Sequence, residues 1–246
     1  MSEQQTPILD HIVLLVSHKT LLGISEHIEG QFTLAPGGTH ADGLTTNKLI
    51  LLPDGVYLEI IAFFDDIDPE KRRNHRWGNE KEDTIVDWAF TLRSESDFSA
   101  VQQRFQDADT KASYTDSIAG GRTKPDGTML KWAVCVPKDG QGKVVPGSLP
   151  FWCLDRTPRA NRVPYEVEPN LAQHPNGVQG ISSVAYDAIF GGTWNYEVPS
   201  ASTAAKHGVS LSGGDASIRL VFNGLKEGEV ELLPGLFFDI ERLNSL

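Results

Sequence analysis

The chain has 246 residues and a formal net charge of −11, which excludes a nucleic-acid-binding protein because phosphate contacts need clustered Lys and Arg. Its length suits one large domain or two small domains that share an interface. The polar N-terminus, the lack of any apolar run near about 20 residues and the two cysteines lead us to expect a cytoplasmic protein without a membrane span or a disulfide framework.

The first 65 residues predict a βαβββ unit. The run ILDHIVLLV is apolar and rich in β-branched residues, which is typical of a buried strand, and Asp54-Gly55 is a strong hairpin signal between two apolar runs. In chain order, the expected elements are a strand at 8–16, a helix at 20–30, a glycine-rich loop at 36–43 and strands at 48–53 and 56–64.

A second unit with the same pattern follows a polar, highly charged segment at 66–83, which is typical of a linker. The two units share a Gly-Gly pair, a later Asp-Gly pair and a closing proline at nearly constant offset, so we interpret them as a duplication. The elements expected in the second unit are a strand at 84–93, a helix at 96–108, a glycine-containing loop at 119–127 and strands at 129–137 and 149–155.

The last third of the chain predicts further strands. The turn signal Pro175-Asn176-Gly177 precedes one apolar run, and two more runs flank a turn at Gly228. This part is either a degenerate third copy or an extension that closes the pocket. The expected division is a first module at 7–65, a linker at 66–83, a second module at 84–157 and a C-terminal β-rich extension at 158–246.

Several stretches follow one another in a specific order and spacing: LDHIVLLV, PGGTHADG, KLILLPDGVYLEIIAF, GGRTKPDG, PFWCLDRTPRANRVP and HPNGVQGISSV. Together they resemble the vicinal oxygen chelate superfamily and, within it, the glyoxalase-like proteins. The resemblance implies an α+β fold in which tandem βαβββ modules form a U-shaped mixed sheet with a concave pocket. It also implies metal ligands on the first and fourth strands of each module, so one divalent ion (zinc, manganese or iron) is the expected cofactor.

His11 and Glu59 match the first-strand and fourth-strand ligands of the first module. Strand alternation places His11 in phase with Val13, and Glu59 in phase with Tyr57, which is a candidate substrate-binding residue. A carboxylate in an apolar strand is costly to bury unpaired, so a metal or a protonated partner is expected beside Glu59. An apolar pocket would raise the pKa of Glu59 and make it a general acid or base even without a metal.

The second module departs from this pattern, because Trp88 matches the histidine position and Trp152 or Cys153 matches the glutamate position. Tryptophan does not ligate metals, whereas a set of His, Glu and Cys can hold zinc with an open position. Where Trp88 and Trp152 replace ligands, they give the pocket an aromatic floor that suits a flat, apolar ligand.

Four further residues are candidates for ligand binding or chemistry. His40 and His174 lie beside glycine-containing turns, where either can supply a missing metal ligand, and His40 is also a candidate catalytic residue. Arg122, after Gly120-Gly121, can bind a carboxylate in bidentate fashion. Arg156 begins the densest basic stretch, at 156–162, which is suited to one anionic group.

Two functions remain open at this point. The first is a lyase, isomerase or ring-opening enzyme in which His11 and Glu59, with or without a divalent metal, polarise or deprotonate a carbon acid next to a carbonyl. The second is a metal-free protein that sequesters an apolar compound. In both cases the partner is a small-molecule ligand rather than nucleic acid or a membrane, and a monomer or homodimer is expected.

Overall fold

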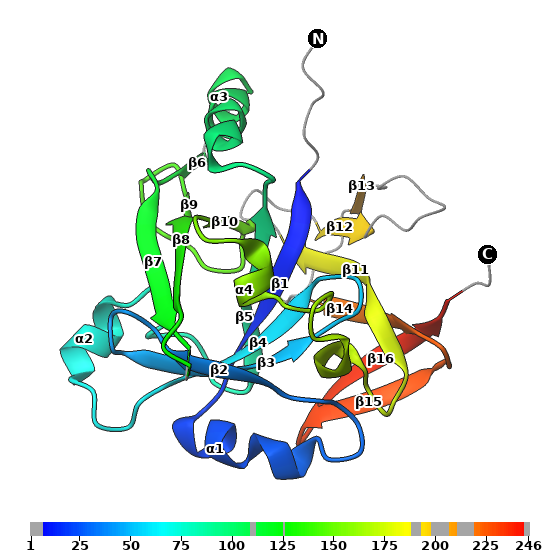
Figure 1. The fold of residues 1–246 in the computed structure, drawn as a ribbon. Helices are drawn as coiled ribbons and strands as arrows, with labels where there is room; N and C mark the ends of the chain where they lie inside the picture. The colour runs from blue at the N-terminus through cyan, green and yellow to red at the C-terminus, as the bar shows by residue number, and fades with distance from the viewer. Residues whose placement is uncertain are drawn as a thin grey trace.

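The computed structural model describes residues 7–108, 112–124, 126–187, 193–197, 207–210 and 219–243, and Figure 1 shows their arrangement. The first module folds largely as its pattern predicts, with the helix beginning two residues earlier and ending three residues earlier than expected. Its elements are β1 (Ile8–Leu15), α1 (His18–His27), β2 (Ala35–Thr39), β3 (Thr45–Leu51) and β4 (Tyr57–Phe63). The Asp54-Gly55 pair forms the β3–β4 turn, and Gly55 adopts a positive φ of 87° there.

The second module repeats this order. Its main elements are β5 (Thr84–Thr91), α3 (Phe98–Asp107), β7 (Ile118–Thr123), β8 (Met129–Cys135) and β10 (Phe151–Asp155). A 3-10 turn (Glu95–Asp97) precedes α3, and the short strands β6 (Ser113–Tyr114) and β9 (Pro137–Lys138) pair with each other. The segment expected to be a linker contains α2 (Pro69–Asn74), which Asp68 caps by accepting hydrogen bonds from Glu70 N and Lys71 N.

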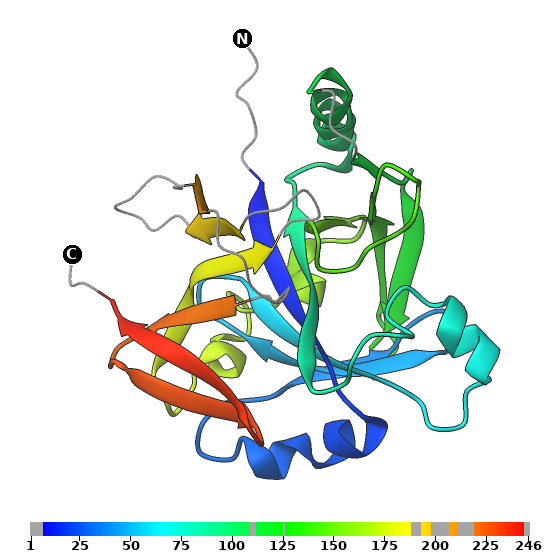
Figure 2. The ribbon, with the colours of Figure 1, turned by 180° about the vertical axis from the view of Figure 1, so that it is seen from behind.

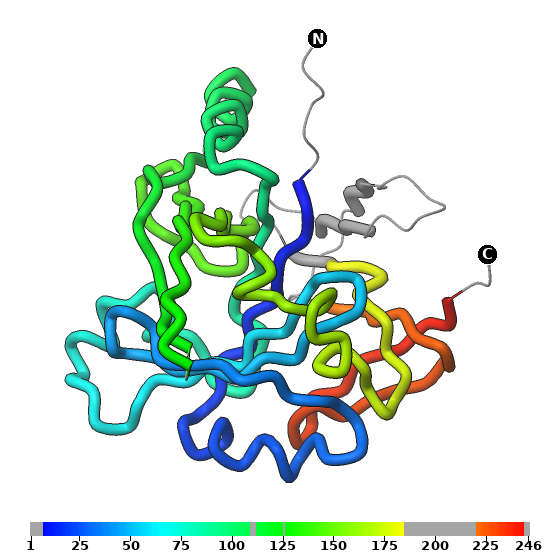
Figure 3. Tube along the Cα trace, in the orientation of Figure 1, coloured from blue at the N-terminus to red at the C-terminus, as the bar shows by residue number. Residues whose placement is uncertain are grey.

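The eight main strands form one mixed sheet in the order β2-β3-β4-β1-β5-β10-β8-β7. The order is palindromic about the β1–β5 pair: β1 pairs with β4 in parallel, β5 pairs with β10 in parallel, and β1 and β5 are antiparallel. Figure 3 shows the blue-to-cyan trace and the green trace meeting along this central pair. The expected α+β fold built from tandem βαβββ modules is confirmed.

The sheet curls until its two edge strands approach each other. His40, just after β2, forms an isolated antiparallel bridge with Arg122 on β7, and the Ala41 N–H donates to the Gly121 carbonyl at 3.0 Å. The curl gives the sheet an inner face, which includes Val13 and Ile61, and an outer face, which includes Ile12 and Ile60. The inner face is therefore enclosed along part of its length.

Beyond β10 the chain forms α4 (Arg159–Arg162), a 3-10 turn (Pro169–Ala172) and a second sheet. The strands of that sheet are β11 (Val178–Asp187), β12 (Thr193–Glu197), β13 (His207–Ser210), β14 (Arg219–Gly224), β15 (Gly228–Leu233) and β16 (Leu236–Arg242). Phe222 and Ile181 from this sheet share one buried core with Ile12 and Ile60, and Figure 2 shows the orange and red strands beside the first module. The second sheet thus supports the outer face rather than closing the cavity on the inner face.

None of the helices in the described part of the chain combines the length and apolar character that crossing a membrane requires.

Candidate functional site

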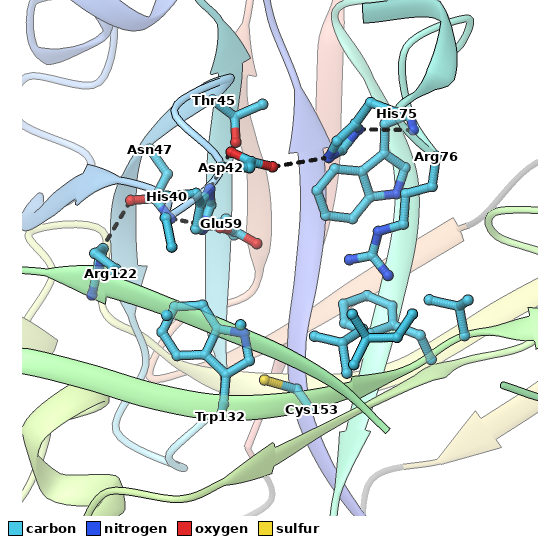
Figure 4. A pocket seen from close by; sticks show the side chains of 18 of the residues that line it. His40, Asp42, Thr45, Asn47, Glu59, His75, Arg76, Arg122, Trp132 and Cys153 are labelled. Atoms are coloured by element: carbon cyan, nitrogen blue, oxygen red, sulfur yellow. Dashed lines mark hydrogen bonds and ion pairs between the residues drawn. The ribbon is translucent and has the colours of Figure 1, made fainter. Parts of the chain in front are cut away.

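A cavity of about 530 Å³ lies on the inner face of the curled sheet. Strands of both modules line it, together with the segment that follows α2, as Figure 4 shows. Of the residues that the sequence singled out, the structure gathers His11, His40, Tyr57, Glu59 and Arg122 around this cavity. Cys153, the alternative match to the fourth-strand ligand, also lines it.

Glu59 lies between two histidines at the polar end of the cavity. Its Oε2 is 3.5 Å from His11 Nε2, and its Oε1 is 3.4 Å from His40 Nε2. Oε1 also accepts a hydrogen bond from the Asn47 amide at 2.5 Å. Since Glu59 and His11 are buried, these contacts replace the water that an exposed carboxylate would have.

The charge state of Glu59 differs from the one expected from an apolar pocket. Burial alone would raise the pKa of its carboxyl, but the contacts with His40, His11 and Asn47 outweigh burial and lower the pKa to about 2. The carboxyl is therefore ionised at neutral pH. Glu59 can accept a proton or bind a cation, and it has no proton to donate.

Asp10 determines which nitrogen of His11 faces the cavity. A β-bulge between Leu9 and His11 interrupts strand alternation, so Leu9 packs in the outer core while the Asp10 carboxylate reaches His11. His11 Nδ1 donates to Asp10 Oδ2 at 2.6 Å, because that carboxyl is ionised. The Nε2 atom of His11 is consequently the one presented to Glu59.

Two arginines of α4 hold Asp10 in its ionised form. Burial would raise the pKa of Asp10, but Arg159 and Arg162 hold it well below its usual value. Arg162 donates to both Asp10 oxygens, at 2.9 and 3.1 Å, and Arg159 Nη1 also donates to Asp10. Arg162 further binds Asp155 through two N–H groups, at 2.7 and 2.9 Å. The basic stretch that suited an external anion is thus largely engaged by carboxylates of the chain itself.

Tyr57 connects this ion network to the cavity. Its ring stacks on His11 with centroids 4.7 Å apart and an interplanar angle of 13°, and its hydroxyl oxygen accepts from Arg162 Nη1 at 2.8 Å. Burial raises the pKa of Tyr57 well above its usual value. The phenol therefore keeps its proton, which the arginine contact leaves free for another acceptor.

Arg122 reaches the site from the second module. Its Nη1 donates at 3.0 Å to Asn47 Oδ1, the amide oxygen of the residue that binds Glu59. The Gly-Gly pair before Arg122 has a packing role, because a Cβ on Gly120 would lie 2.4 Å from Nε1 of the Trp132 indole. That indole forms part of the cavity wall, as Figure 4 shows.

The two tryptophans expected on the pocket floor lie elsewhere. Trp88 packs in the outer core with Ile12, and Trp152 packs against α3 near Phe98 and Tyr114. Neither lines the cavity. The physical reason is the two-residue period of a strand, which reverses the face of a side chain when a match is displaced by one position.

The strand register identifies the true equivalents in the second module. His11 pairs with Tyr57 across the parallel β1–β4 ladder, and Ala89 pairs with Phe151 across the parallel β5–β10 ladder. Glu59 follows Tyr57 by two residues, as Cys153 follows Phe151. Ala89 therefore corresponds to His11, and Cys153 corresponds to Glu59, so the second module offers one thiol at the two ligand positions.

Arg156 and His174 also lie away from the cavity. Arg156 forms a two-hydrogen-bond ion pair with Glu95, at 2.6 and 2.8 Å, on the surface. His174 is held between the Leu51 carbonyl and the Thr33 N–H, at 2.8 and 3.1 Å, and its burial lowers its pKa. Each side chain is occupied by these partners, and neither reaches the polar end of the cavity.

One set of three side chains in the described part of the chain comes close enough to share a metal ion as it stands, and a second set has suitable donor atoms. Donor atoms of Asp10, His11 and Cys153 lie within 4.8 Å of one another, but both Asp10 oxygens are engaged by arginines and burial raises the pKa of the Cys153 thiol. In the other set, the Nε2 atoms of His11 and His40 face the ionised Glu59. The other ring nitrogens are held by Asp10 and by Thr45, the latter at 2.8 Å. Two imidazoles and a carboxylate, with partners on the outer nitrogens, have the donor chemistry of a divalent-metal site. Their donor atoms do not all lie within 4.8 Å of one another, so the side chains would have to move closer together to hold an ion.

The segment expected to be a linker contributes residues that the sequence analysis missed. His75, Arg76 and Trp77 follow α2 and line the cavity. The sequence did carry one signal, because Trp77 is a large aromatic residue in an otherwise charged stretch. In the structure the Trp77 side chain is buried and its Nε1 donates to Asp87 at 2.9 Å. Asn47 carried no such signal, because its role depends on pairing between β3 and β4.

The family model and one solved structure agree with this fold. The model of the glyoxalase-like domain family matches residues 9–188. A search of curated proteins finds no match. Among solved structures, a hypothetical protein from Staphylococcus aureus has a TM-score of 0.63 at 12% identity, covering 97% of this chain and 100% of that one. Methylmalonyl-CoA epimerase from Mycobacterium tuberculosis has a TM-score of 0.38 at 13% identity, covering 65% of this chain and 95% of that one.

Proposed function

The chain belongs to the glyoxalase-like domain family, and we propose that it acts as an enzyme on a small organic molecule bound in the cavity. The observation that carries this proposal is the ionised Glu59 carboxylate held between His11 Nε2 and His40 Nε2. The reaction class is a lyase, isomerase or ring-opening step that begins with removal of a proton from a carbon next to a carbonyl group.

Glu59 is the residue that would take this proton. A carboxylate whose pKa is near 2 is a weak base, so the substrate carbon must be acidified by polarisation of its neighbouring oxygen. Tyr57 supports this step, because its hydroxyl retains a proton that it can donate to a carbonyl or enolate oxygen. Arg122 lines the same cavity and supplies a positive charge beside Asn47.

His11, His40 and Glu59 would hold a divalent metal ion in this site. An ion bound there would act as a Lewis acid toward an oxygen of the substrate. Asp10 keeps the proton on His11 Nδ1 and so keeps Nε2 available, and Asn47 keeps the Glu59 carboxylate oriented toward the two histidines. Because Ala89 has no donor atom, this ligand set comes from the first module alone, with His40 in the loop after β2.

A second candidate is a binding protein without turnover. The aromatic side chains of Trp77, Trp132 and Phe151 on the cavity wall favour it, since they would hold an apolar ligand whether or not chemistry follows. The two candidates differ in what they require of Glu59, which is the base in the first and only a wall residue in the second.

Solvent exchange at carbon separates these candidates without knowledge of the natural substrate. The protein is incubated in D₂O with pyruvate and 2-oxobutyrate, and loss of the protons next to the ketone is followed by proton NMR. We expect exchange above the buffer rate and a loss of at least about 100-fold in Glu59→Gln, the range for general-base catalysis. Glu29→Gln, which changes an exposed glutamate on the surface, is the matched control.

Two results would count against the enzyme. Wild-type exchange no faster than buffer would contradict it, and so would a Glu59→Gln variant as fast as wild type. Binding of either keto acid without exchange, and with unchanged affinity in Glu59→Gln, would favour the sequestering protein.

A further inference from the structure

Arg76 is a cation in the cavity wall that the site described above does not use. It follows α2, and Figure 4 shows its side chain extending into the cavity toward the strands that carry Trp132 and Cys153. Its guanidinium carbon lies 3.9 Å from the centroid of the Trp77 ring and 4.1 Å from that of Phe151. The guanidinium is therefore held by two aromatic side chains.

This arginine has no carboxylate at ion-pair distance among the residues that the structure describes, although Asp87 and Glu59 act on its charge from farther away. The ion pairs of the described residues do not include it, and its Nη1 is buried without a hydrogen-bond partner. Asp87 is nearby in sequence and buried, but its carboxylate accepts from Trp77 Nε1 and from the Trp88 and Gly147 N–H groups. Burial lowers the pKa of Arg76, which reflects the cost of keeping this charge out of water.

The aromatic contacts leave a specific part of the guanidinium available. Stacking uses the faces of the planar group, whereas its N–H donors point outward in the plane. A donor set of that shape matches two oxygens of one carboxylate or phosphate in a bidentate contact. An uncharged ligand would leave this partly buried cation without an ion pair at contact distance, so the partner that fits its unpaired Nη1 is an oxyanion.

We propose that Arg76 is the anchor of an oxyanion subsite, which binds a carboxylate or phosphate group of the cavity's ligand while the rest of the ligand lies against the aromatic wall. This inference rests on the proposed use of the cavity for a small molecule, and it names the class of that molecule: an organic anion. Trp77 and Phe151 position the guanidinium, and the polar end at Glu59 faces the opposite, reacting part of the ligand.

Equilibrium binding of matched probes tests the subsite. Phenylacetate, phenyl phosphate and the neutral phenylacetamide share one ring, and their binding is followed by tryptophan fluorescence because Trp77 and Trp132 line the cavity. We expect wild type to bind at least one anion tenfold or more tighter than phenylacetamide. In Arg76→Met this preference is lost, with phenylacetamide affinity within twofold of wild type. The anion that loses more affinity identifies the head group.

Two further variants keep the test independent of folding. Arg73→Met removes a charge from an exposed position on α2 and should leave all three affinities unchanged. Arg76→Lys keeps the charge but loses the planar donor pair, and it should bind the preferred anion at least threefold more weakly. Without ligand, Arg76→Met should melt at or above the wild-type temperature, because it removes a partly buried charge that has no ion pair among the described residues.

The proposed subsite is contradicted if wild type binds the two anions no more tightly than phenylacetamide. It is equally wrong if Arg76→Met binds the anions as wild type does, or loses all three probes to the same extent. These outcomes are separate from the exchange assay: exchange that depends on Glu59 would stand without the subsite, and anion binding that depends on Arg76 would stand without exchange.

Discussion

The two modules place different side chains at the same two positions of one backbone plan. In the first module these positions hold His11 on β1 and Glu59 on β4, which both line the cavity, whereas in the second they hold Ala89 on β5 and Cys153 on β10, of which only Cys153 lines it. The surroundings differ in the same way. Asp10, which precedes His11, is ionised and accepts a hydrogen bond from it, whereas Trp88, which precedes Ala89, packs in the outer core.

This difference shows that repetition of the fold does not carry repetition of the chemistry. The second module supplies walls and one charge, through Trp132, Phe151 and Arg122. The first module, including the loop after β2, supplies the ionised Glu59 carboxylate and the imidazoles of His11 and His40. Variants in each module test this division.

Asp10→Asn should have the largest effect on stability. It removes the buried carboxylate that Arg159 and Arg162 share and leaves Asp155 to balance both arginines; breaking such a buried pair typically costs about 3–5 kcal/mol. Urea unfolding measures the loss, and Asp66→Asn, at an exposed position, is the control. A loss below about 1 kcal/mol would mean that the network of the first module is not needed for its fold.

His40→Ala should reduce the exchange rate by about 100-fold, because one of the two imidazoles beside Glu59 is lost. His27→Ala, on the exposed end of α1, should leave the rate unchanged. The measurement is the NMR exchange rate of 2-oxobutyrate in D₂O. Equal exchange rates in His40→Ala and His27→Ala would show that the loop after β2 takes no part in the reaction.

Asp54, in the β3–β4 hairpin of the first module, should make the free energy of unfolding depend on pH. Burial raises its pKa to about 6, although Val56 and Ile181 N–H groups bind its carboxylate. The folded state thus holds the proton more tightly than the unfolded state, so protonation of Asp54 increases the free energy of unfolding. This contribution is fully present below pH 4 and is lost as the pH rises through 6. Relative to Asp54→Asn, wild type should gain about 2 kcal/mol from pH 7 to pH 4 in urea unfolding. A constant difference would contradict the raised pKa.

Cys153→Ala should have the smallest effect on chemistry, although Cys153 corresponds to Glu59. Its thiol stays protonated because burial raises its pKa, so the exchange rate should change less than threefold. Removal of the buried sulfur should cost about 1 kcal/mol in urea unfolding. A large rate loss in this folded variant would make the second module a participant in the reaction.

The parts of the fold that follow local patterns could be predicted from the sequence. Apolar strands, the Asp54-Gly55 turn and the first-module pair His11 and Glu59 all follow from periodicity and from the resemblance of the flanking stretches. The assignment of Trp88 and Trp152 to the cavity failed because a displacement of one residue reverses the face of a strand. Only the pairing of β5 with β10 resolves that choice.

Contacts between distant segments could not be predicted. The bulge at Asp10 and the arrival of Arg162 from α4 depend on tertiary packing, and so does the low pKa of Glu59. The charged segment after β4 looked like a linker because its polar residues outnumber its apolar ones. Its cavity residues, Arg76 and Trp77, are meaningful only beside Phe151.

Titration of the metal-free protein with Co²⁺ tests most directly whether the reactive groups belong to the first module. We predict one equivalent bound in wild type and in Cys153→Ala, with identical visible spectra and no thiolate charge-transfer band. Affinity should fall at least tenfold in Glu59→Gln and His40→Ala, because each removes one of the three proposed ligands. A charge-transfer band that disappears in Cys153→Ala, with affinity unchanged in Glu59→Gln, would place the metal on the second module and contradict the account.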